Sequence, residues 1–116
     1  MTTPADELWL ARMLEAIQKT KRYQDRGRQA FFSDDDTQQL VVHNLEHIVE
    51  SADHMSQRFK KQHSAVDWAR LRKVRTMIVP GYAEIPVEDV WEFLRSELPQ
   101  IEKRLLKLRT RASSPA

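Results

Sequence analysis

The sequence contains no cysteine, and only two of its 116 residues are glycine. Without cysteine, neither a disulfide framework nor a thiolate metal site can form. Scarce glycine argues against a fold rich in tight turns, which rely on residues that accept a positive φ. No apolar run approaches the length of a membrane span, and the first residues lack the cationic and then apolar order of a signal peptide. We therefore expect a cytoplasmic protein without a membrane segment.

The composition is that of one globular domain. Hydrophobic residues make up 41% and charged residues 31% of the chain, with a net charge of +2. We interpret residues 1–116 as a single domain. The basic residues gather in two clusters: Arg70, Arg72, Lys73, Arg75, and Lys103, Arg104, Lys107, Arg109, Arg111. Such clusters are most often solvated helix faces, and the alternative is a surface that attracts phosphate backbone.

Helix signals mark the first half of the chain. Thr3 followed by Pro4 predicts a helix start, and apolar residues at helical spacing extend the helix until Gly27, giving a helix near 4–26. Ser33 with three following aspartates predicts a second start. The helix near 36–61 should run unbroken, because its apolar stripe never loses phase. That stripe is Val41, Leu45, Ile48, Ala52, Met55 and Phe59.

Proline and glycine punctuate the second half. Asp67 is predicted to cap a shorter helix near 67–79, which Pro80-Gly81 ends. Pro86 opens a helix near 86–108, and Pro99 inside it should kink it or begin a new segment. Residues 110–116 are typical of a frayed tail, and nothing indicates a strand. The pattern predicts an all-α, up-and-down bundle of about four to five helices.

One motif imitates a metal site. His43-Asn44-Leu45-Glu46-His47 matches the HxxEH pattern of inverted zinc peptidases. A zinc site of that kind needs a third protein ligand, and no candidate is evident. Both histidines also lie off the apolar stripe. We interpret them as exposed or interfacial residues and predict no metal and no cofactor.

Arg75 is the most informative polar residue. Helical spacing places it with Trp68, Leu71 and Ile78 on the apolar face of its helix. Because guanidinium cannot lose its proton, a buried arginine must meet a carboxylate, a carbonyl or a bound anion. One hypothesis is an ion pair with Glu46 or Glu50 of the second helix. The other is an arginine held at a helix interface to bind phosphate.

Three blocks resemble the HepT type of HEPN proteins, over residues from about 6 to 108. The first is Met-Leu-Glu-Ala-Ile at 13–17, and the second is Asn-Leu-Glu-His-Ile-Val-Glu-Ser-Ala at 44–52. The third is the order of Trp68, Arg75, Gly81-Tyr82 and Val90-Trp91. The resemblance implies a helical HEPN-like bundle that forms a homodimer, with its ribonuclease site composed across the two protomers.

The resemblance also implies site residues. Family members share a motif of Arg, a polar residue that is often Asn, three further residues, His, any residue and Tyr. Here Arg75 and Tyr82 match it, whereas Thr76 stands at the Asn position and Pro80 at the His position. The Arg and His of the family cleave RNA without metal. Because proline has no titratable group, we expect the general acid–base step to be lost and ribonuclease activity to be impaired.

The same resemblance implies partners. It predicts the toxin component of a toxin–antitoxin pair, whose MNT-type nucleotidyltransferase antitoxin attaches AMP to Tyr82, and an RNA substrate such as tRNA. Pro80 leaves three readings open: a naturally degenerate member, a substituted form of an active toxin, or replacement of the lost group by His43. The alternative function is a non-catalytic helical module that binds a nucleotidyltransferase partner, nucleotide or RNA and in which Arg75 is structural.

Overall fold

The computed structural model describes residues 3–77 and 86–113, with side chains placed through residue 108. Every regular element within these residues is a helix, in agreement with the predicted all-α class. The elements are α1 (Pro4–Gln24), α2 (Arg28–Ser33), α3 (Asp35–His54), α4 (Gln57–Gln62), α5 (Trp68–Met77), α6 (Val87–Ser96) and α7 (Leu98–Ser113). None of the described helices is long and apolar enough to cross a membrane.

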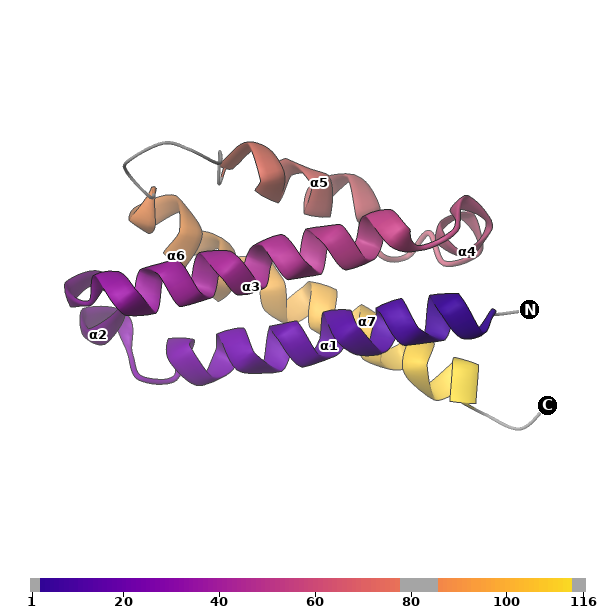
Figure 1. The fold of residues 1–116 in the computed structure, drawn as a ribbon, viewed down its shortest axis with the longest axis horizontal. Helices are drawn as coiled ribbons and strands as arrows, with labels where there is room; N and C mark the ends of the chain where they lie inside the picture. Colours follow the sequence, from indigo (N-terminus) through magenta and orange to yellow (C-terminus); the bar gives the residue numbers. More distant parts are fainter. Residues whose placement is uncertain (1–2, 78–85, 114–116) are drawn as a thin grey trace.

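The two long helices form the body of the bundle. α1 and α3 lie side by side and run in opposite directions, while α7 packs along the other side of α1 and α5 lies along α3 (Figure 1). The predicted stripe of α3 faces the core: Val41, Leu45 and Ile48 are each at most 1% exposed. α1 contributes Leu10, Met13 and Ile17, also nearly fully buried. This core fixes the position of α3, along which α5 packs.

Side-chain caps confirm two of the predicted helix starts. The Thr3 hydroxyl accepts the amide proton of Asp6 at 3.1 Å, at the start of α1. Asp67 Oδ1 accepts the amide proton of Arg70 at 3.0 Å, at the start of α5. Both bonds satisfy donors that have no intrahelical partner. α1 ends at Gln24, and Gly27, the N-cap of α2, has a φ of 100°, a conformation that a side chain would strain.

The predicted helix near 36–61 begins close to where it was expected, at Asp35, but its predicted cap and its predicted end are wrong. Ser33 is the last residue of a short helix, α2, and Asp34 is the residue that caps α3. α3 ends at His54, because Met55 adopts extended backbone, and α4 begins after Ser56. The Ser56 hydroxyl caps α4 by accepting the Phe59 amide proton, so a new helix begins directly after the break.

The C-terminal half follows the proline signals. α6 begins after Pro86, and Pro99 stands in the first turn of a separate helix, α7, so it begins a new segment as predicted. The stripe continues across the junction, since Leu94, Leu98 and Leu105 are each at most 1% exposed. α7 extends to Ser113, which lies within the segment predicted to be a frayed tail.

Candidate functional site

Arg75 lies in the last turn of α5, next to the segment that carries the rest of the predicted motif. The prediction that it faces the core is wrong: its side chain is 61% exposed. Leu71 and Val74 are the buried residues of α5 instead. On a helix of 3.6 residues per turn, the positions three and four after Leu71 flank the same face almost equally. The apolar side chain of Val74 is buried, and the charged side chain of Arg75 reaches solvent.

An ion pair joins Arg75 to α3. Its Nη2 lies 2.5 Å from Oδ2 of Asp53, whose side chain is 35% exposed. An acid of the second long helix was predicted as the partner, but as Glu46 or Glu50. Glu50 instead lines the groove beside α1 and lies 3.9 Å from His54. Asp53 contacts only one nitrogen of the guanidinium, so the rest of the fork is available to a ligand.

The other predicted motif residues differ in how far the structure describes them. Thr76 is exposed, and its hydroxyl donates to the Lys73 carbonyl at 2.7 Å, one turn back on the same helix. This bond holds the hydroxyl against the backbone rather than toward Arg75. Pro80 and Tyr82, like Ile78 of the predicted stripe, lie outside the described residues.

Two further cations, which the sequence analysis did not single out as a pair, lie near this ion pair. Lys60 of α4 is only 7% exposed, although lysine is seldom buried. Burial lowers the pKa of its ammonium group, Arg72 lowers it further, and Asp53 acts in the opposite direction. The charges of Arg72 and Asp53 thus act on the Lys60 ammonium in opposite directions. The break at Met55–Ser56 sets the placement of Lys60, and the apolar periodicity gives no sign of it.

The other side of α5 has a different electrostatic character. A cavity of about 260 Å³ separates α5 from α6 and is lined by Arg70, Lys73, Val74, Met77, Asp89, Glu92, Phe93, Ser96 and Glu97. Within it Arg70 forms an ion pair with Glu97. Three acids against two cations make this groove unfavourable for a polyanion.

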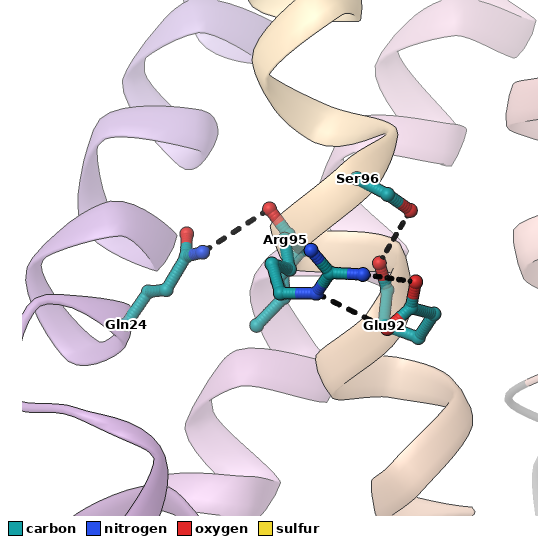
Figure 2. Close-up of polar contacts among 5 residues, drawn as sticks. Gln24, Glu92, Arg95 and Ser96 are labelled. Atoms are coloured by element: carbon teal, nitrogen blue, oxygen red, sulfur yellow. Dashed lines mark hydrogen bonds and ion pairs between the residues drawn. The ribbon is translucent and has the colours of Figure 1, made fainter.

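Arg95, near the end of α6, is also paired with an acid of its own helix. Figure 2 shows Arg95 bonded to Glu92 through two nitrogens, at 3.2 and 2.7 Å. Gln24 of α1 donates to the backbone carbonyl of Leu94 at 3.2 Å and so ties α1 to α6. The Arg95 charge is therefore satisfied within its own helix. Of the basic residues of α5 that the structure describes, Arg70 is paired with Glu97 and Arg75 with Asp53.

The histidine motif does not assemble a metal site in the described part of the chain. His43 and His47 are exposed, as predicted, and their Nε2 atoms lie 3.1 Å apart. No group of three or more potential ligands occurs among the described residues. His43 also lies ten residues before Asp53 on α3, a separation of about 15 Å along the helix.

Comparison with known proteins gives the family. The sequence profile described as "Ribonuclease HepT-like" matches residues 13–108, which is most of the chain. The chain belongs to the HepT-like ribonuclease family. A probable ribonuclease HepT of Thermococcus cleftensis is 27% identical over 79 residues, covering 68% of this chain and 72% of that protein. A putative RNase of Caldanaerobacter subterraneus is 26% identical over 78 residues, covering 67% and 70%. No solved structure matches the chain significantly.

Membership of the HepT-like family confirms the resemblance that the sequence blocks indicated. It also agrees with the helical architecture, because the match begins inside α1 and ends inside α7. The comparison does not test the individual site residues.

Proposed function

We propose that this chain acts on RNA as the HepT-like toxin component of a toxin–antitoxin pair, with impaired ribonuclease activity. Family membership supports the RNA-directed chemistry, and the relatives it matches are named as ribonucleases. The observation that carries the proposal is Arg75. Its guanidinium is exposed at the end of α5, oriented by a single contact with Asp53, and still has free donors.

Such an arginine suits a phosphoryl-transfer site. A guanidinium presents several donors in a fixed plane and stays charged, so it stabilises negative charge that develops on phosphate oxygens. The Asp53 contact fixes the plane while leaving the opposite edge open. A homodimer would bring a second copy of this region to the same RNA.

The proposed impairment follows from the residue at the family's histidine position. Proline neither takes a proton from the attacking oxygen nor gives one to the leaving oxygen, so Pro80 removes the general acid–base step. Thr76, at the family's Asn position, directs its hydroxyl to its own helix. Restoring histidine should raise the rate by about a hundred- to ten-thousandfold.

The test is cleavage of bulk tRNA and messenger RNA without added metal. The unmodified chain should cleave slowly, and Pro80→His should cleave faster, with Thr76→Asn adding to the gain if the amide orients the imidazole. Robust, Arg75-dependent cleavage by the unmodified chain would contradict the proposed impairment. No gain in the double variant Thr76→Asn/Pro80→His would favour the non-catalytic interaction module.

The proposed partner is an MNT-type nucleotidyltransferase that attaches AMP to Tyr82. The chemistry supports this: AMP beside Arg75 would place negative charge where an RNA phosphate would bind and so block the site. We expect incubation with that enzyme, ATP and magnesium to add AMP to the tryptic peptide spanning residues 76–95, as read by mass spectrometry. If neither this peptide nor its Pro80→His counterpart gains AMP, the assignment of Tyr82 is wrong.

A further inference from the structure

A groove of about 310 Å³ lies between α1 and α3, which run side by side in opposite directions (Figure 1). Its volume is at the lower end of the range for pockets that hold small ligands. The most buried residues of its lining are Ala16 from α1 and Asn44 and Ser51 from α3, each at most 8% exposed. The base of the groove is therefore partly polar, although it lies between the two helices that supply much of the core.

Asn44 brings a side-chain amide into this groove. Only 8% of the residue is exposed, and its amide forms no hydrogen bond with any described residue. Every side-chain nitrogen or oxygen that is shielded from solvent in the described part of the chain has a hydrogen-bond partner, so the Asn44 amide is open to solvent. Because Asn44 lines the groove, its amide opens into it. A carboxamide held in this way offers both donor and acceptor to a ligand.

A cation without an acidic partner lines the same groove. The Arg12 guanidinium lies 4.9 Å from the ring centroid of Trp9, which in turn stacks on His54 at 4.3 Å. No ion pair joins Arg12 to an acid among the described residues. The two glutamates of the lining lie 3.4 and 3.9 Å from basic side chains of their own helices. Arg12, oriented by the indole ring, therefore has its charge available to an anionic group.

The stacked rings set the register of the two helices. Trp9 faces His54, and α1 and α3 are antiparallel. Arg12, three residues after Trp9, therefore lies opposite Ser51, three residues before the stacked histidine. Asn44 lies seven residues from Ser51, or about 10 Å along α3. The groove thus presents a cation and a hydroxyl at one end and an amide at the other, a spacing that matches a nucleotide from its phosphate to the edge of its base.

The cationic end of the groove lies next to the candidate site. His54, which stacks on Trp9, directly follows Asp53, the partner of Arg75. The side chains of these two consecutive residues of α3 contact α1 and α5 respectively. A strand that binds at Arg75 can therefore continue across the end of α3 to Arg12.

We propose that this groove binds one adenine nucleotide of an RNA strand, with Asn44 pairing with the base and Arg12 with the phosphate. The inference rests on the proposed function and assigns a base preference to it. A carboxamide presents a donor and an acceptor side by side, which matches N6 and N7 of adenine, whereas N7 and O6 of guanine both accept. Because basic and acidic side chains balance in the lining, the groove suits a single nucleotide rather than a duplex.

Binding of single-stranded RNA tests the base assignment. Labelled oligouridylates that differ only in their central base, which is A, G, C or U, are titrated by fluorescence anisotropy against the unmodified chain, Asn44→Leu and the control Gln39→Leu. Gln39 is an exposed amide of α3 outside the groove. The unmodified chain and Gln39→Leu should bind the adenine-centred RNA about 5- to 150-fold more tightly than the others, as expected of one bidentate contact. Asn44→Leu should bind all of them alike.

A second variant and thermal unfolding separate recognition from a structural role. Leucine replaces an amide that has no partner in the described fold, so Asn44→Leu should keep or raise Tm. Asn44→Asp replaces the amide donor with an acceptor, which suits N4 of cytosine, so it should move the preference from adenine to cytosine. A preference for adenine that survives in Asn44→Asp, or that Gln39→Leu also loses, would overturn the assignment of Asn44.

The phosphate contact has its own readout. Arg12→Gln should lower the slope of log affinity against log salt by about 0.7 and weaken binding of every RNA by the same factor, with the base preference intact. The control Arg22→Gln removes an exposed arginine of α1 outside the groove and should leave the slope unchanged. Equal changes in the two variants would overturn the contact of Arg12 with the phosphate.

Free AMP separates this inference from the proposed function. Tighter binding of the adenine-centred RNA than of AMP supports the RNA strand as the ligand. RNA binding without a base preference would overturn the groove assignment and leave the proposed function standing. Asn44-dependent binding of AMP without RNA binding would refute both the RNA function and the assignment of the groove to a strand.

Discussion

Asp6 determines how the start of α1 is tied to the break between α3 and α4. Its carboxylate accepts the Ser56 amide proton at 2.9 Å and the hydroxyl protons of Ser56 and Thr3, each at 2.9 Å. Burial raises the pKa of this carboxyl, but the hydrogen bonds from Ser56 and Thr3 outweigh burial and hold the pKa below its ordinary value of 3.8. The ionised form is therefore the stabilising one.

We predict that Asp6→Asn lowers the free energy of unfolding by about 1–3 kcal/mol at pH 7, because the Ser56 and Thr3 donors lose a charged acceptor. Since folding depresses the pKa, the contribution of Asp6 is fully present above pH 3.8 and is lost as pH falls through the lower folded value. Denaturant unfolding at several pH values checks this. The gap between wild type and variant should narrow in acid, whereas exposed Asp25→Asn should show no gap. A gap that is constant down to strong acid would contradict the assignment.

Arg75 should matter little for folding. Its ion pair with Asp53 is largely exposed, and pairs of that kind contribute about 0–1 kcal/mol. We predict that Arg75→Ala and Asp53→Ala leave the unfolding midpoint nearly unchanged in a urea titration. A loss of several kcal/mol in either variant would show that the pair is structural, and any loss of RNA cleavage would then lack a specific meaning.

At the scale of elements, α2 is a small helix that closes one end of the bundle. Phe31 is fully buried, and its ring lies 5.3 Å from that of Trp91 on α6. The neighbouring Phe32 is only partly buried and is covered by the Arg28 guanidinium at 4.4 Å. The sequence analysis did not resolve α2, because a helix of six residues is too short to show periodicity.

We predict that Phe31→Ala costs about 3–5 kcal/mol of unfolding free energy, because it leaves a cavity between α2 and α6. Phe32→Ala removes a similar side chain from a half-exposed position and should cost distinctly less. Chemical denaturation of both variants gives the comparison. Equal losses would mean that α2 does not anchor the bundle through Phe31.

For the second long helix, the sequence predicted which residues are buried better than it predicted where the helix ends. Val41, Met55 and Phe59 are all buried, as the stripe of the second helix requires. The helix nevertheless stops before Met55, because Ser56 binds Asp6 and caps α4, and a residue far away in sequence decides this. Periodicity carries no information on such a tertiary contact. The local signal was Ser56 itself, a favoured cap placed three residues before Phe59.

The candidate site was predictable only in part. Arg75 was identified from its place in the motif, and an acid on α3 was expected as its partner. Its burial was predicted wrongly, because Leu71 with Val74 and Leu71 with Arg75 fit the helical period equally well. The burial of Lys60 was missed, since α4 begins anew after the α3–α4 break.

At the scale of the whole molecule, the core takes up the aromatic side chains of α2 and α6. Phe31 and Phe93 are buried in the core, and Phe32 and Trp91 pack against it. The large hydrophobic residues exposed in the described part of the chain are Leu8 and Leu40, at 48% and 44%. The homodimer is a proposal that rests on the family.

The absence of cysteine makes the dimer testable by cross-linking. We predict a dimer by light scattering at micromolar concentration, with the two regions around Arg75 close together. A bifunctional thiol reagent should then join two chains of Arg72→Cys, whose exposed side chain lies one helical turn before Arg75 on the same face of α5, more readily than two chains of Glu15→Cys, which is exposed on α1. A monomer, or preferential cross-linking through Glu15→Cys, would contradict this arrangement.

The central claim is that Arg75 belongs to a ribonuclease site that lacks only its proton-transfer group. A double-variant cycle of metal-free RNA cleavage rates measures it most directly, using the unmodified chain, Pro80→His, Arg75→Ala and both changes together. We expect Pro80→His to raise the rate by about a hundredfold or more, and Arg75→Ala to abolish that gain without unfolding the protein. A gain that persists without Arg75, or no gain in any background, would contradict the account.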